Sequence, residues 1–431
     1  MNKKRKLSLA LAVLLSLSML SGCNKETPVE PAEENETVEP AEQQEEPAKP
    51  EYDNSQQYTA VVLQDGDSIT GGTYTATGTD ESVFEASGNV KADITGSVIN
   101  KESGDASSAD DSSFKGVNAA VRAYGNSTIT MKDCTVNADT SNATGVFAYD
   151  GGTVKIYDST VTVTGGGAGG IQVAGGGTLY ATNLTVTSSS KAAIRSDRGG
   201  GTMTVYGGSY TSLGSNGCPV IYSTADILVK NASGVSEKSR AVIIEGKNSV
   251  TLENAVLEGN DQSTKEGSVR ANVLLYQSAS GDAKEGTSVF TMTGGKLISD
   301  SGAMFYCTNT ASVINLSKAE LVLSDTGELL RVSAGRWGKD GKNGGRCTLN
   351  CEDQKLEGTV YVDDISSLEM NLENTEFTGS VNGEGEVSVT LDSGSSWTLT
   401  EDSYISSFNG DVSCIIGNGH VLYVNGTAIN E

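Results

Sequence analysis

An apolar column that recurs at a nearly fixed interval limits what this chain can fold into more than any other feature of its sequence. The segments 128–136, 153–161 and 178–186 align without a gap at an offset of 25 residues. The column then continues with steps of 24, 24, 23, 40 and 24 residues, and its members are Ile129, Val154, Leu179, Met203, Ile227, Val250, Phe290 and Ile314. Self-similarity with a period of roughly 20 to 50 residues is the signature of repeat proteins, in which each unit packs on its neighbours. The sequence therefore predicts a solenoid.

Each repeat contains short runs in which apolar and polar residues alternate, which is the pattern of half-buried β-strands. Two of these runs are separated by a break, and a third stands eight residues before the first, as in 120–123, 145–148 and 170–173. The break falls on residues that tolerate a left-handed backbone, namely Asp133, Asp158, Asn183, Gly207, Asn231, Asn254 and Gly294. We therefore expect three short strands per coil of 23–25 residues, with a tight turn at the same place in every coil.

This combination of period and turn chemistry resembles a right-handed parallel β-helix, and the resemblance covers roughly residues 58–431. It is similar to the pectate-lyase-like superfamily and to bacterial surface β-helix proteins that act as adhesins or bind glycans, which implies an all-β fold with terminal capping coils. A leucine-rich repeat has a comparable period but needs a leucine framework and a helical segment per repeat, and both are missing here. The step of 40 residues predicts an insertion near 257–272, and a Gly-rich stretch predicts a second one near 336–345.

The first 57 residues have a different character from the repeats. Residues 1–22 combine a basic start with an apolar stretch, and the run Leu20-Ser21-Gly22-Cys23 follows directly. This resembles a bacterial lipoprotein signal, which implies cleavage before Cys23 and attachment of a lipid, palmitate included, to that residue. An ordinary secretory signal is the alternative. Residues 23–57 hold most of the prolines and many acids, so we expect a disordered stem and an extracytoplasmic, surface-exposed protein anchored to the cell membrane.

Charge and residue counts exclude several classes of function. The chain has 30 Lys+Arg against 55 Asp+Glu, and the net charge of −25 argues against a nucleic-acid partner. The single histidine, His420, excludes a metal site built on several imidazoles, and a catalytic triad would have to use that one residue. We assign no catalytic residue, no metal and no cofactor. A disulfide is compatible with several cysteines, and sequence does not choose between Cys218, Cys307, Cys347, Cys351 and Cys414.

One face of the predicted solenoid carries the candidate binding residues. Because side chains alternate along a strand, the residue after each inward apolar position points outward. The outward positions and their neighbours predict an exposed strip made of Arg122, Tyr124, Phe147, Tyr149, Arg195, Asp197, Arg198, Tyr222, Arg331, Trp337 and Tyr361. Rings beside planar polar groups suit a sugar chain. Ordinary sheet surface also favours aromatic residues, so both interpretations stay open at this point.

Two observations bear on what such a strip could do. Basic residues gather around Trp337 on an otherwise acidic chain, which points to an anionic polymer such as an acidic polysaccharide. Arg195 and Arg331 lie five coils apart, or roughly 24 Å at about 4.8 Å per coil, which is too far for one reaction centre. We therefore predict an adhesin-like surface lipoprotein that binds glycan or another envelope or host polymer. A lyase or hydrolase acting on an acidic polysaccharide is the alternative, and a structural spacer is the third.

Overall fold

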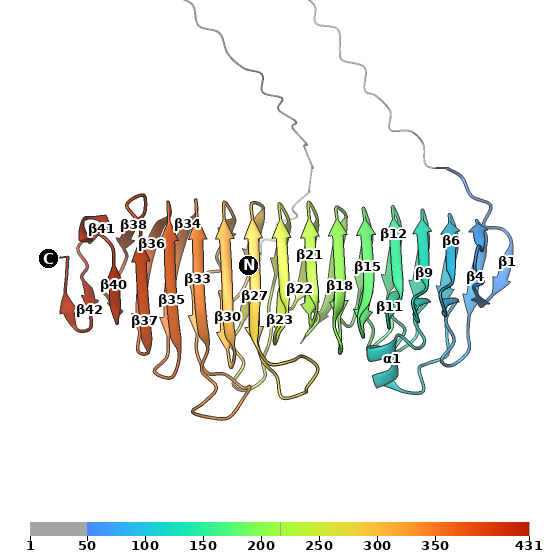
Figure 1. Cartoon of the computed structure of the whole chain (residues 1–431), viewed down its shortest axis with the longest axis horizontal. Helices are drawn as coiled ribbons and strands as arrows, with labels where there is room; N and C mark the ends of the chain where they lie inside the picture. The colour runs from blue at the N-terminus through green and yellow to red at the C-terminus, as the bar shows by residue number, and fades with distance from the viewer. Residues whose placement is uncertain (1–49, 216, 431) are drawn as a thin grey trace, which may run out of the picture. The chain divides into compact units, whose positions relative to one another are not determined.

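The computed structural model describes residues 50–215 and 217–430. The signal segment 1–22, Cys23 and most of the predicted stem lie outside the described residues. In the part from Glu51 onward the strands stack side by side into a parallel β-helix, as Figure 1 shows. Pairings between described strands are parallel, apart from the pairing of β42 with β43. The all-β fold with three strands per coil is therefore confirmed.

Three sheets run along the solenoid, and we call them sheets A, B and C. Sheet A consists of β1 (Gln57–Thr59), β4 (Thr73–Ala76), β7 (Val98–Lys101), β10 (Thr135–Ala138), β13 (Thr160–Val163), β16 (Thr185–Ser188), β19 (Ser209–Ser215), β22 (Ser233–Lys238), β25 (Val256–Gly259), β28 (Lys296–Ser299) and β31 (Glu320–Val322). Sheet C consists of β3 (Ser68–Thr70), β6 (Lys91–Thr95), β9 (Thr128–Lys132), β12 (Thr153–Tyr157), β15 (Gly177–Thr182), β18 (Gly201–Tyr206), β21 (Asp226–Lys230), β24 (Ser249–Glu253), β27 (Thr287–Thr293), β30 (Ala311–Ser317), β33 (Arg346–Glu352), β35 (Ser367–Glu373), β37 (Glu386–Leu391) and β40 (Ser407–Asn409).

Sheet B is the third sheet, and up to Val332 each of its strands follows a strand of sheet A along the chain and precedes a strand of sheet C. It consists of β2 (Val61–Val62), β5 (Phe84–Ala86), β8 (Val121–Ala123), β11 (Val146–Tyr149), β14 (Ile171–Ala174), β17 (Ile194–Ser196), β20 (Ile221–Ser223), β23 (Val242–Glu245), β26 (Ala271–Tyr276), β29 (Ala303–Thr308), β32 (Glu328–Val332), β34 (Lys355–Val362), β36 (Glu376–Gly383), β38 (Ser396–Leu399), β39 (Ser403–Ile405), β41 (Ile415–Ile416), β42 (Leu422–Val424) and β43 (Thr427–Ala428). A 3-10 turn, η1 (Val412–Cys414), precedes β41.

The predicted apolar column is a continuous ladder of paired residues in sheet C. Ile129 pairs with Val154 and Val154 with Leu179, and the same register continues coil by coil to Ile314. Val250 pairs directly with Phe290, so the step of 40 residues is a single coil. These side chains are buried and stack along the interior, where they form one hydrophobic core with the inward residues of sheets A and B.

The predicted tight turn joins sheet C to sheet A in successive coils. Asp158 and Asn183 have φ of 49° and 54°, in the left-handed region, and Asn183 Nδ2 donates to Asp158 Oδ1 at 3.3 Å. Gly207 follows in the same column with φ of 65°, and a Cβ there would lie 2.5 Å from Asn183 Oδ1. The turns of successive coils therefore stack on one another, and the Asn183 and Asp158 side chains form a hydrogen bond between two of them.

Four long segments leave the coils at the ends of sheet B strands. Segments 102–120 and 260–270 connect sheet A to sheet B, whereas segments 277–286 and 333–345 connect sheet B to sheet C. The first contains α1 (Ala109–Lys115), which lies on the same side as the other loops in Figure 1. No helix among the described residues is long and apolar enough to cross a membrane.

The solenoid contacts the chain just before its first strand. Tyr52, in the stretch predicted to be part of a disordered stem, donates its hydroxyl hydrogen to Asp133 Oδ2 at 2.9 Å. Thr73 donates from Oγ1 to the Asn54 carbonyl at 3.0 Å. Residues 52–54 thus lie against the first coils, held by the Tyr52 hydroxyl and the Asn54 carbonyl.

Candidate functional site

The outward column of sheet B has the predicted register. Arg122, Phe147, Gln172, Arg195 and Tyr222 pair in sequence from coil to coil. The column continues through Ile243, Leu274, Tyr306, Arg331 and Tyr361. Sequence reasoning missed Ile243, Leu274 and Tyr306. Their strands β23, β26 and β29 are almost continuously apolar, so alternation could not separate inward from outward residues there, and the insertion before β26 broke the spacing.

The expectation that this strip is exposed is wrong for its first third. Phe147 is fully buried, although it points away from the core, because Gly116 and Ala119 of the 102–120 segment lie over its ring. Tyr149 packs against the same small apolar cluster. Gln172 is buried too, and its Nε2 donates to the Ser113 carbonyl at 2.8 Å. The Phe147 ring is therefore covered by the 102–120 segment and offers no surface to a ligand.

Arg122 and Tyr124 are likewise engaged within the protein. The guanidinium of Arg122 lies 4.1 Å from the centre of the Tyr124 ring, and its Nη1 is 3.1 Å from Glu85 Oε2. Its Nε donates to the Lys115 carbonyl at 2.9 Å, at the end of α1. Tyr124 also donates to Glu85, at 3.1 Å. Arg122 thus fixes the α1 segment to sheet B, and Tyr124 and Glu85 hold Arg122 in place.

Arg195, Asp197 and Arg198 were predicted to be exposed, and the structure confirms this for Arg198 only. Arg195 Nη2 lies 2.6 Å from Asp197 Oδ2, and the Asp197 side chain is only 3% exposed. Arg198 Nη2 lies 2.6 Å from Asp282 Oδ1, and its guanidinium is 4.1 Å from the centre of the Phe114 ring. Inserted segments supply Asp282 and Phe114, which the strand pattern could not reveal. These charges are therefore paired.

Arg331 and Tyr361 form a separate pair farther along the column. The Arg331 guanidinium is 4.7 Å from the centre of the Tyr361 ring, and Arg331 Nε lies 2.8 Å from Glu328 Oε1. The paired register places Arg331 five coils after Arg195. The two basic clusters therefore do not form one site.

Between those clusters the outer face of sheet B forms a cleft of about 160 Å³, which we call the sheet B cleft. Tyr222, Ile243, Leu274, Tyr276 and Tyr306 line it from the strands, and Trp337 lines it from the 333–345 segment. The ring of Trp337 lies 5.4 Å from that of Tyr276, centre to centre. These residues belong to an apolar cluster separate from the solenoid core. The cleft is thus an aromatic surface, built outside the coils and walled by two loops.

The two loops that wall the cleft are held to each other and to the sheet. Arg336 donates its backbone N–H to the Gly267 carbonyl at 3.1 Å, which joins the 333–345 and 260–270 segments. The Tyr306 hydroxyl donates to the Ala334 carbonyl at 3.2 Å, at the start of the 333–345 segment. Asn343 Nδ2 donates to the Trp337 carbonyl at 3.0 Å and closes the loop around that residue.

All charged side chains that line the cleft are basic. They are Arg240, Lys265 and Arg336, and no described lining residue is acidic. Arg240 is buried, lies 2.8 Å from Asp261 Oδ2 and donates to the Val269 carbonyl, while its Nε has no partner among the described residues. Burial lowers the pKa of the Arg240 guanidinium. Arg336 lies 4.5 Å from the centre of the Trp337 ring. Because Asp261 offsets the charge of Arg240, the positive charge at the cleft comes from Lys265 and Arg336.

Two tyrosines of the cleft are fixed from below by a buried carboxylate. Tyr222 and Tyr276 donate their hydroxyl hydrogens to Glu245 Oε2 at 2.5 and 2.9 Å, and Ser278 donates to Glu245 Oε1. Burial raises the pKa of the Tyr222 and Tyr276 hydroxyls above their ordinary value. Both rings are therefore held in place as neutral groups, which gives the cleft a rigid floor.

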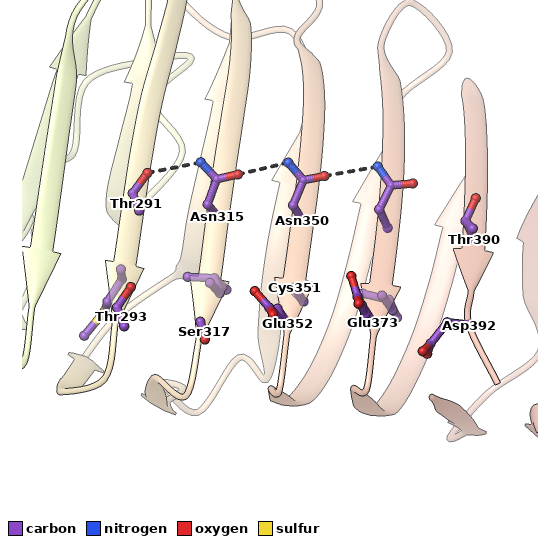
Figure 2. Close-up of a pocket in the computed structure, with 14 residues that line it drawn as sticks. Thr291, Thr293, Asn315, Ser317, Asn350, Cys351, Glu352, Glu373, Thr390 and Asp392 are labelled. Atoms are coloured by element: carbon purple, nitrogen blue, oxygen red, sulfur yellow. Dashed lines mark hydrogen bonds between the residues drawn. The ribbon is translucent and has the colours of Figure 1, made fainter. Parts of the chain in front are cut away.

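A larger hollow, of about 590 Å³, lies on the outer face of sheet C and is shown in Figure 2. Its centre is a row of amides in which Asn315 donates to Thr291, Asn350 to Asn315 and Asn371 to Asn350, at 2.9 to 3.1 Å. Glu352, Glu373 and Asp392 also line it, and no lining residue is aromatic. Because its amides bond mainly to one another, we favour the smaller sheet B cleft as the functional site.

The described residues contain no group of three or more His, Cys, Asp or Glu side chains that could hold a metal ion. A hydrolase would need two carboxylates facing its substrate, and Asp150 and Asp197 are two coils apart at the ends of sheet B strands; Asp150 is an exposed turn residue with φ of 47°. Asp197 is engaged by Arg195, so the two carboxylates do not face a shared cavity.

Comparisons with protein-family models, curated proteins and solved structures found no match to this chain.

Proposed function

We propose that this protein is a glycan-binding surface lipoprotein of the pectate-lyase-like, adhesin type, and that the sheet B cleft binds an acidic sugar unit of a polysaccharide. The observation that carries the proposal is the combination of a fixed aromatic floor with charged lining residues of one sign. Cys23 would carry the lipid that anchors the chain to the membrane, and the solenoid would present the cleft outside the cell.

The aromatic part of the cleft supports a ligand with apolar faces and hydroxyl edges. Tyr276 and Trp337 offer ring faces, and aromatic side chains bury large areas at low cost in conformational entropy. The volume of about 160 Å³ is below the roughly 300–1,000 Å³ of sites that enclose drug-sized ligands. One sugar ring in the cleft, with the polymer continuing over the loops, matches that size.

The basic part of the cleft supports a carboxylate or sulfate on that sugar. Arg336 and Lys265 are exposed, and the buried Nε of Arg240 has no partner in the part of the chain that the structure describes. Guanidinium groups match planar carboxylates, and such charge-assisted bonds are roughly twice as strong as neutral ones. The chain as a whole carries a net charge of −25, so attraction of an anionic polymer has to come from this local field.

The second candidate is a lyase or hydrolase that cleaves the same acidic polysaccharide. A lyase needs a base that removes a proton beside the carboxylate, and the Arg240 guanidinium, which is paired with Asp261, does not supply one. A structural spacer, the third possibility, would bind no polymer.

The test is retention of the purified full chain on an immobilised uronate polysaccharide and on the same polymer after reduction of its carboxyl groups. We expect retention on the acidic form only. Trp337→Ala and Arg336→Ala should weaken binding at least about tenfold, as expected for central aromatic and arginine contacts. Tyr157→Ala, on the outer face of sheet C, is the matched control and should bind like the wild type.

Equal retention of all variants, or equal binding to both polymers, would reject the cleft as an acidic-sugar site. New unsaturated ends in the eluate would instead establish the lyase, and new reducing ends the hydrolase. No retention by any form would leave the spacer.

A further inference from the structure

Two inward cysteines of consecutive coils meet inside the solenoid. Cys307 lies near the end of β29 in sheet B, and Cys347 lies near the start of β33 in sheet C. Their Sγ atoms are 3.5 Å apart, and both residues are buried. They face each other at the corner where the 333–345 segment returns to the coil. All six described cysteines are free thiols, and this is the one pair among them with a sulfur–sulfur contact.

The register of the coils brings these two residues together and fixes them there. Cys307 pairs with Leu275 on one side and Val332 on the other. Cys347 pairs with Ser312 and Leu368. Each backbone is thus held by a ladder of hydrogen bonds on both sides, so the two side chains stay opposite each other without any bond between them.

We propose that Cys307 and Cys347 are joined by a disulfide when the protein folds outside the reducing cytoplasm. The Sγ atoms are 3.5 Å apart and an S–S bond is about 2.05 Å long, so the sulfurs would have to approach by about 1.5 Å. The oxidant is a low-molecular-weight disulfide. In two exchange steps the pair of thiols becomes one disulfide, and one oxidised glutathione becomes two molecules of the reduced thiol. This inference rests on the location outside the cytoplasm given in the proposed function, and it does not depend on glycan binding.

The bond has to form before the coil closes. Exchange requires a thiolate, and the contact with the Cys307 thiol together with burial raises the pKa of the Cys347 thiol well above its ordinary value. A folded, reduced protein should therefore react slowly with oxidised glutathione, whereas a refolding chain should react readily. Once formed, the disulfide should resist reductant, because burial keeps an attacking thiolate away from its sulfurs.

Such a bond would have a structural consequence at the sheet B cleft. It would close a ring across 40 residues that includes the whole 333–345 segment, and it would tie the return of that segment to β29. β29 also carries Tyr306 of the cleft floor. Loss of loop-closure entropy from the unfolded chain should stabilise the coils on both sides.

The experiment is to refold the full chain in a mixture of oxidised and reduced glutathione, alkylate the free thiols, and map the peptides by mass spectrometry without reduction. We expect a single cross-link between the peptides that contain Cys307 and Cys347. The oxidised protein should melt about 5 °C above the same protein refolded with reductant, from the chain-entropy estimate for this ring and this chain length.

Two serine variants control for packing. Cys347→Ser should lose the cross-link and the difference between the two melting temperatures, whatever the substitution itself costs. Cys351→Ser, another buried position on the same strand, should keep both. Free thiols at both positions after oxidative refolding, a link to a different cysteine, or a melting difference that survives in Cys347→Ser would overturn the proposal.

Discussion

Replacing Ile156 by aspartate tests the inward register of the coils. Ile156 is fully buried and stacks in register between Met131 and Ala181 of the neighbouring coils. Truncating a buried aliphatic side chain costs about 2–5 kcal/mol, and an unpaired buried carboxylate adds several kcal/mol or stays protonated. The sum, at least about 5 kcal/mol, is comparable to the whole stability of many domains.

The matched control is the neighbouring residue, Lys155, which points outward between Thr130 and Tyr180. Lys155→Asp changes the same strand by the same new side chain at a partly exposed position, where surface substitutions stay within about 0.5 kcal/mol. Urea unfolding followed by circular dichroism measures both variants. If Ile156→Asp and Lys155→Asp unfold at the same urea concentration, the inward and outward assignment is wrong.

Three further predictions concern the segment that covers Phe147, the buried Lys191 and the lipid anchor at Cys23. Phe147→Ala should cost about 3–5 kcal/mol of local stability and release the 102–120 segment, seen as faster amide hydrogen exchange there but not in the coils, and unchanged exchange would contradict the covering role of that segment. Lys191 donates to Ser113 Oγ at 2.6 Å, and burial lowers its pKa to about 8 from 10.5, so the unfolded chain binds more protons between these values. The unfolding free energy of the wild type relative to Lys191→Met should therefore rise from pH 8 to 10.5, and a flat or falling difference would refute the assignment. Cys23→Ala should move the protein from the membrane fraction to the soluble fraction, whereas unchanged membrane association would reject the lipid anchor.

Most of the coil could be predicted from sequence because its physics is local and repeated. Strand alternation and left-handed turn residues recur at a fixed period, so one register error would conflict with every other coil. That is why the column from Ile129 to Ile314 and the outward column from Arg122 to Tyr361 are paired as expected.

The covering of the outer face was not predictable in the same way. Phe147 and Arg198 meet partners from inserted segments whose positions follow no period. A local signal did exist for α1, because Ser108 caps its first turn and Gly116 ends it with φ of 72°. The place where α1 lies on sheet B depends on contacts far apart in sequence, such as Gln172 with Ser113.

Tryptophan fluorescence tests the central claim most directly, because the chain has two tryptophans in opposite environments. Trp337 lines the sheet B cleft, whereas Trp397 is fully buried in the core and donates to the Gly379 carbonyl. Titration with an acidic oligosaccharide should change the emission of the wild type in a saturable way, and the change should vanish in Trp337→Phe and with the carboxyl-reduced oligosaccharide. A saturable change that persists in Trp337→Phe, or binding by calorimetry with no change in emission, would contradict the assignment of the sheet B cleft as the glycan site.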